Sequence, residues 1–186
     1  MKAKLVSYKT KNQIFNDFIS LVKQMLQAFD IDRWQVRQLE QVFKVNVLKP
    51  SIYISVINYP QRGSQYRKKE RCGDVVIKQN LTKQEVKIRF SASRIELPTD
   101  KPDTFNSCDI LELIKDFMQS SEGIKFLANL GYAQYRATEV SNRQFVDDED
   151  NFQFLPYFDC TFVYTNSWST EVPLLDKVIE KGIYRV

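Results

Sequence analysis

Two periods of apolar residues run along this chain and predict a mixture of helices and strands. Apolar residues recur at three- and four-residue steps over 14–29 and 110–118, which is the period of a helix with one buried face. A shorter helical pattern covers 121–130 and ends at Gly131, where a left-handed C-terminal cap is expected. Alternating apolar and polar residues, typical of half-buried strands, occupy 51–59, 74–80, 85–93, 132–140 and 154–164.

The order of these patterns indicates the class of fold. Residues 80–83 are predicted to join their flanking strands as a hairpin, and a further short strand is predicted near 34–37. The order is helix, strands, helices, strands, without strict alternation of strand and helix. We therefore predict an α+β fold in a single domain over 12–166: a mostly antiparallel, mixed β-sheet flanked by helices.

Both ends of the chain are predicted to be extensions of this domain. Residues 1–11 carry four lysines and no acid, which favours a flexible or partner-ordered arm. Residues 167–186 begin around Trp168 and are predicted to contain a brief helix with Thr170 as its cap. The predicted core does not need this C-terminal extension, so packing on a neighbouring subunit is one expected role.

Composition removes several classes of chemistry. The 186 residues include no histidine, the commonest general base and metal ligand. Cys72, Cys108 and Cys160 are far apart, which argues against a disulfide framework or a zinc site and favours a reducing cytosol. Cys160 alternates with polar neighbours and is predicted to be a core residue. No apolar run approaches the ~20 residues that a membrane span needs. We expect no enzymatic activity, cofactor or membrane.

An acidic connector, residues 141–151, separates the last two strand patterns. Its four consecutive acids allow three interpretations: a metal site, a solvated loop or a surface that meets a partner. The connector has no glycine for the tight turn of a metal-binding loop, whereas Arg143, Phe145 and Phe152 flank the acids. The candidate contact residues are Arg143, Phe145, Asp147, Asp148, Glu149, Asp150, Phe152 and Trp168.

A predicted loop over 61–73 is basic, with five basic residues, one acid and Tyr66. It fits a solvated loop tip, or a phosphate-tracking loop on which Tyr66 stacks a base. A third interpretation pairs it with the acidic connector of a neighbouring copy, a head-to-tail contact that makes a ring when it closes. Its basic residues are Arg62, Arg67, Lys68, Lys69 and Arg71.

Several of these segments together resemble the neck and tail-terminator proteins of tailed bacteriophages. The resemblance runs from about 50 to 172 and is carried by Phe-Leu-Ala-Asn-Leu-Gly at 126–131, Tyr-Arg at 135–136 and the connector over 143–152. Members have a helix ending in Leu-Gly, a strand, a connector of the type Arg-x-Leu-Pro-Leu-Val-Asp-Gly-Glu-Asp-Gln-Tyr and a second strand. Here Phe145 replaces a common proline and Asp148 a common glycine.

The resemblance implies a non-enzymatic structural protein of the virion, assembled in the host bacterial cytoplasm. Such proteins form a ring, usually a hexamer, at the head-proximal end of the tail, where they stop tube growth and make the joint to the neck and connector. The implied partners are other copies, the tube and neck proteins, with the sheath as a further candidate. DNA would pass through the channel without sequence-specific binding, and the basic loop would face the lumen or the adjoining ring. The alternative function is a small nucleic-acid-binding protein that uses residues 62–71.

Overall fold

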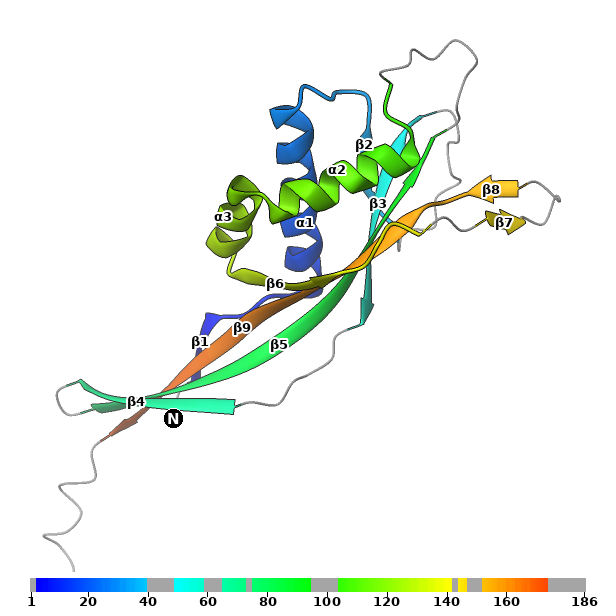
Figure 1. Ribbon diagram of the computed structural model, residues 1–186. Helices are drawn as coiled ribbons and strands as arrows, with labels where there is room; N and C mark the ends of the chain where they lie inside the picture. The colour runs from blue at the N-terminus through cyan, green and yellow to red at the C-terminus, as the bar shows by residue number, and fades with distance from the viewer. Residues whose placement is uncertain are drawn as a thin grey trace, which may run out of the picture. The chain divides into compact units, whose positions relative to one another are not determined.

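The computed structural model describes residues 3–39, 49–58, 65–72, 75–94, 104–141, 144–146 and 152–173 (Figure 1). The chain divides into two compact units. The helical unit comprises Thr10–Pro60 and Glu85–Tyr164. The strand unit comprises Met1–Lys9, Gln61–Gln84 and Thr165–Val186. The domain boundaries predicted from the sequence do not coincide with this division, because 12–166 includes parts of both units.

The three helices belong to the helical unit and begin at residues with capping side chains. In the first, the Thr10 hydroxyl accepts from the Gln13 amide while the Gln13 side chain accepts from the Thr10 amide. In the second, Asn106 Oδ1 accepts from the amides of Cys108 and Asp109. The helices are α1 (Lys11–Ala28), α2 (Ser107–Gln119) and α3 (Ser121–Asn129).

Seven strands form one sheet, with the hydrogen-bonded order β1-β9-β5-β3-β2 and with β4 added to β5 and β6 to β9. The β2–β3 pair is parallel, and the pairs β1–β9, β3–β5, β4–β5 and β6–β9 are antiparallel. The predicted α+β fold with a mostly antiparallel, mixed sheet is therefore confirmed. The strands are β1 (Ala3–Ser7), β2 (Gln35–Gln38), β3 (Ser51–Asn58), β4 (Gln65–Cys72), β5 (Val75–Ser93), β6 (Tyr132–Ala137), β7 (Gln144–Val146), β8 (Phe152–Phe154) and β9 (Tyr157–Pro173).

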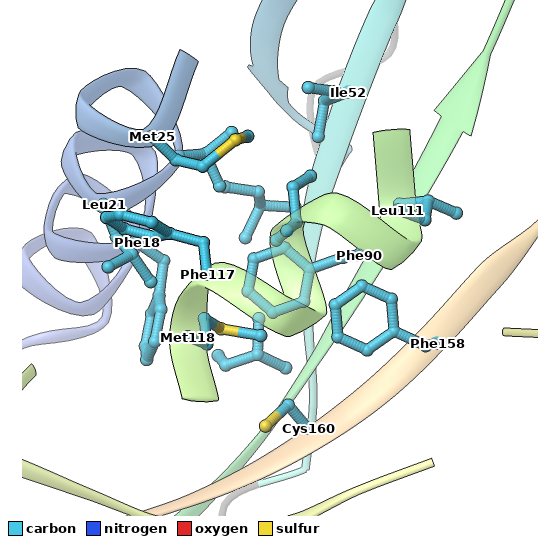
Figure 2. Packing of buried hydrophobic residues seen from close by; sticks show 14 of the residues in the cluster. Phe18, Leu21, Met25, Ile52, Phe90, Leu111, Phe117, Met118, Phe158 and Cys160 are labelled. Atoms are coloured by element: carbon cyan, nitrogen blue, oxygen red, sulfur yellow. The ribbon is translucent and has the colours of Figure 1, made fainter. Parts of the chain in front are cut away.

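The hydrophobic core lies within the helical unit, where the helices cover one face of its strands (Figure 1). Phe90 of β5 stacks on Phe158 of β9, with ring centroids 5.0 Å apart and planes 14° apart. Phe18 of α1 packs against Phe90 in a T-shaped arrangement, and its ring centroid lies 4.5 Å from that of Phe162. Figure 2 shows Phe18, Phe90 and Phe158 in one cluster with Met25 and Met118. Cys160 is fully buried in the same cluster, as its alternation with polar neighbours predicts.

The described residues of the strand unit do not form such a core. Among the residues that the structure describes, every buried apolar side chain belongs to the helical unit. In the strand unit Leu5, Val6 and Tyr8 are 68%, 54% and 55% exposed, and Trp168 is 42% exposed. A sheet gains independent stability from a buried hydrophobic face. The strand unit lacks one within the described chain, so its apolar side chains are available to a partner.

Several predictions about this unit were wrong. Residues 80–83 do not turn: β5 continues through them, and Leu81 and Thr82 pair with Tyr66 and Gln65 of β4. The segment from Val75 to Ser93 contains no glycine, which a tight hairpin turn favours. The expected arm over 1–11 contains β1, paired antiparallel with β9. The short helix expected after Thr170 is not formed up to Pro173. β9 extends to that residue, and Thr170 pairs with Ala3 of β1.

Candidate functional site

A basic pocket of about 330 Å³ lies in the strand unit. Three neighbouring strands contribute to it: β4, the first part of β5 and the last part of β9. Its lining combines four cationic side chains with one exposed tryptophan. The lining residues are Arg67, Lys68, Lys69, Lys78, Asn80, Trp168, Thr170 and Val172.

The β4–β5 register places cations of the two strands together. Lys69 lies opposite Lys78, and Arg67 lies opposite Asn80. Residues directly opposite in an antiparallel pair share one face and have Cβ atoms about 5 Å apart, so the Lys69–Lys78 pair is a repulsive one. Lys68 instead has Glu70 as an ion-pair partner, with 3.8 Å between Nζ and Oε2. Within the described chain no carboxylate pairs with Arg67, Lys69 or Lys78. The pocket therefore concentrates positive charge that the described chain leaves uncompensated.

The apolar half of the pocket comes from β9. Trp168, Thr170 and Val172 are two residues apart and so point to one face of the strand. Across the β1–β9 pair Leu5 lies opposite Trp168, and both side chains are exposed. An exposed apolar strip thus borders the basic residues, an arrangement suited to a ligand that carries both negative charge and apolar side chains.

The structure corrects the predicted basic loop. Gln65–Cys72 is a strand, and the charged run from Arg67 to Arg71 lies on it rather than in a loop. Arg71 is on β4 but does not line the pocket. Arg62 lies outside the described residues. Lys78 and Asn80 were missed as site residues, although the alternation over 74–80 placed them on one face of a strand. The expectation that Trp168 meets a partner remains a prediction.

The acidic connector is framed by a separate two-stranded sheet. Gln144–Val146 (β7) pairs antiparallel with Phe152–Phe154 (β8), with Val146 opposite Phe152. Phe145 and Phe152 therefore lie on the paired strands at the two shoulders of the connector. Four acids and one cation of the predicted contact set lie outside the described residues: Arg143, Asp147, Asp148, Glu149 and Asp150.

An ion-pair cluster around the buried Asp159 joins β5 to β9 in the helical unit. The Arg89 guanidinium donates to both carboxylate oxygens of Asp159, at 2.7 and 3.1 Å, and Lys87 Nζ lies 3.0 Å from Oδ2. The Arg89 guanidinium also lies over the Tyr157 ring, 4.0 Å from its centroid. Burial of Asp159 opposes its ionisation, but hydrogen bonds from Arg89 and Lys87 outweigh it and hold the pKa of Asp159 below its ordinary value.

Replacing Asp159 by asparagine is expected to lower the free energy of unfolding of the helical unit by about 2 kcal/mol at pH 7, because charge-assisted hydrogen bonds are lost. The pKa of Asp159 is lower in the folded chain than in the unfolded one. Its contribution is therefore complete above about pH 4 and is lost as the pH falls through the folded pKa. Urea unfolding of both chains across this pH range measures the difference.

The control for that experiment is Glu139→Gln. Glu139 pairs with Lys115 at 3.0 Å but has a side chain that is 92% exposed. Solvent screens such a pair, so this variant should unfold close to the parent at every pH. A difference between Asp159→Asn and the parent that stays constant down to pH 2 would contradict the assigned role of the carboxylate.

The three cysteines of the described chain differ in burial. Burial raises the pKa of the Cys160 thiol to about 12, so it stays protonated at neutral pH. Cys72 is exposed and Cys108 is half-buried. The described residues contain no group of three histidine, cysteine, aspartate or glutamate side chains placed to hold a metal ion. In the same ranges no helix has the length and apolar character to cross a membrane.

A second concave surface lies in the helical unit, between α2, α3 and β6. It has a volume of about 540 Å³, and its lining is mostly small or apolar. Arg136 is the only charged side chain among its lining residues. This surface offers few polar groups for chemistry. The residues include Met118, Ile124, Leu127, Tyr132, Ala133 and Arg136.

Comparison with known proteins places the chain in a family. Residues 13–174 match the model of the family described as E217 gateway protein gp29. No curated protein sequence matches. Among solved structures, the sheath/tube terminator of an extracellular contractile injection system, PVC, in its extended state is similar, with a TM-score of 0.49 and 7% identity. The similarity covers 97% of this chain and 65% of that one, so this chain spans less than two thirds of its length. Because the family match covers most of the 186 residues, this chain belongs to the E217 gateway protein gp29 family.

Proposed function

We propose that this chain is a non-enzymatic structural protein of a phage virion. Copies of it form a ring, with six copies as the expected number, at the head-proximal end of the tail. The ring ends the tail tube and joins it to the neck and connector. The observation that carries this proposal is the match of residues 13–174 to a family whose description names a gateway protein.

The exposed strand unit supports an assembled state. Its described strands contribute no buried apolar side chain, yet they present Leu5, Val6 and Trp168 to solvent. Exposed apolar surface of this kind is typical of a protein–protein contact. A structural role in which neighbouring copies or tail proteins cover these strands accounts for it.

The proposed partners follow from the proposed position. They are other copies of this chain, the tail tube and the neck and connector proteins, with the sheath as a further candidate. DNA passes through the channel of the ring without sequence-specific contacts. Assembly takes place in the host bacterial cytoplasm, and the finished protein resides in the tail or neck of the virion.

An end-capping assay tests this function. Purified chain is added to purified tail tubes, and the tubes are imaged by negative stain and offered further tube subunits. The chain is expected to form a ring on one end only and to stop elongation at that end. Tubes that stay uncapped and continue to elongate at both ends would contradict the proposal, whatever the oligomeric state of the free chain.

A second candidate function is nucleic-acid binding by the strand unit. The observation that favours it is the pocket that four cations and the exposed Trp168 line together. Cations can follow a phosphate backbone, and an indole can stack on a base. It predicts binding that weakens steeply with salt and with the loss of Arg67, Lys68 and Lys69. The peptide experiment below includes this alternative as one of its outcomes.

A further inference from the structure

We propose that the basic pocket of the strand unit binds the acidic connector of a second copy of this chain. The pocket is the surface lined by Arg67, Lys69 and Lys78 on its basic side and by Trp168 on its apolar side. The connector is residues 141–151, which include β7 and lead into β8. This inference rests on the proposed ring, because it identifies the copy-to-copy contact from which such a ring would be built.

Two lysines of the pocket, Lys69 and Lys78, repel each other. Lys69 and Lys78 lie directly opposite on β4 and β5, where like charges destabilise a strand pair. The adjacent Lys68 differs, because Glu70 of the same strand forms an ion pair with it. Lys69 and Lys78 have no such carboxylate within the described chain. An anionic ligand seated between Lys69 and Lys78 would remove the repulsion. The charge pattern thus predicts a ligand with several carboxylates or phosphates.

The apolar side of the pocket favours a protein ligand over a simple anion. The pocket continues from its cations onto Trp168 and Val172, and Leu5 lies opposite Trp168 on β1. A ligand that fills both halves must place acids beside apolar groups. The connector has that composition, with acids over 147–150 between Phe145 and Phe152. The β7–β8 pair fixes the backbone of both phenylalanines next to the acidic run.

A contact between the pocket and the connector of another copy can repeat from copy to copy. The pocket and the connector are different surfaces of one chain, so their contact is heterologous. Each copy offers one pocket and one connector, and a series of such contacts closes into a ring when the rotation between copies allows it. The acids of the connector would supply the carboxylates that Arg67, Lys69 and Lys78 lack within the described chain.

The test uses a full-length chain in which its own connector is neutralised by Asp147→Asn, Asp148→Asn, Glu149→Gln and Asp150→Asn, so that no copy can fill the pocket with its connector. A synthetic peptide with the sequence of residues 143–154 is titrated into it. The peptide contains no tryptophan, and the second tryptophan of the chain, Trp34, is buried in the helical unit, so a change in emission reports binding at the exposed Trp168. We expect saturable binding that weakens as salt is added.

Three comparisons make the result specific. Arg67→Glu, Lys69→Glu and Lys78→Glu, added together to this chain, should weaken binding at least ~10-fold, since each reversal turns an attraction into a repulsion. A matched variant with the same change in net charge, Lys23→Glu, Lys83→Glu and Lys125→Glu, should bind as the parent does. A peptide whose four acids are amides should not bind.

Absence of peptide binding, or equal binding to the pocket-reversed variant, would overturn the inference. Tighter binding of an oligothymidylate of about 10 nucleotides through the same three cations would also overturn it and favour nucleic acid as the ligand. Failure here differs from failure of the proposed function. End-capping of tubes by a chain that does not bind the peptide leaves the function standing, and peptide binding without end-capping removes the tail-end role while retaining the copy-to-copy contact.

Discussion

Replacing Phe90 by alanine is expected to lower the free energy of unfolding of the helical unit by about 3–5 kcal/mol, the usual cost of truncating a buried aromatic residue. Phe90 is fully buried in the middle of the core. Its ring stacks on Phe158, with centroids 5.0 Å apart, and makes a T-shaped contact with Phe18, with centroids 6.2 Å apart. Truncation therefore removes apolar burial and two ring contacts, and it leaves a cavity between β5, β9 and α1.

Urea unfolding followed by far-ultraviolet circular dichroism measures this loss, and an unchanged slope would show that the unfolded state is unaffected. Phe105→Ala is the matched control. Phe105 is 37% exposed, and the hydrogen bond that it receives from Arg94 is to its main-chain oxygen, which the substitution retains. The control should cost less than about 1 kcal/mol. A Phe90→Ala loss no larger than that of the control would contradict the assigned core.

Gly123→Ala is expected to destabilise the corner between α2 and α3 by about 3 kcal/mol, at the upper end of the cost of overpacking. A Cβ at this position would lie 2.0 Å from the Phe117 oxygen and 2.9 Å from Met118 Cα. Both obstacles are backbone, so a rotamer change cannot relieve them. The corner is held by Ser120, whose hydroxyl donates to the Phe117 oxygen and accepts from the Gly123 amide.

Gly131 is the control because its glycine is needed for a different reason. It has a φ of +79°, and a Cβ there would meet nothing within 4 Å. Gly131→Ala should thus cost only the ~1–2 kcal/mol of a left-handed alanine, and Gly131→Asn should cost less. Thermal and urea unfolding of the three variants rank them. A Gly131→Ala chain less stable than Gly123→Ala would contradict the steric account of the corner.

The elements that the sequence predicted well are those with one buried face. The period of α1 follows from burial of Phe18 and Met25, and alternation of β9 follows from burial of Phe158 and Cys160. Gly131 at the end of α3 was also predicted, since only glycine adopts its backbone conformation without cost. Local rules suffice for such elements because a buried face leaves a period in the residues.

The strand unit could not be predicted in this way. β4 reads Gln-Tyr-Arg-Lys-Lys-Glu-Arg-Cys, and its residues 67–72 are exposed, so burial leaves no alternation to detect. The same absence hid the continuity of β5, whose described residues before Glu85 are half-buried or exposed. The basic residues and Trp168 were each identified as candidates, but about a hundred residues separate them in sequence. Only the strand order of the sheet brings them to one pocket.

We propose that copies of this chain form a ring between the tail tube and the neck. The most direct measurement is a cryo-electron-microscopy reconstruction of the neck and upper tail of virions that carry this chain. We expect a single ring of six copies, into whose density the helical unit fits and in which the strand unit contacts a neighbouring copy. Density for this chain elsewhere in the virion, or only as isolated single copies, would contradict it.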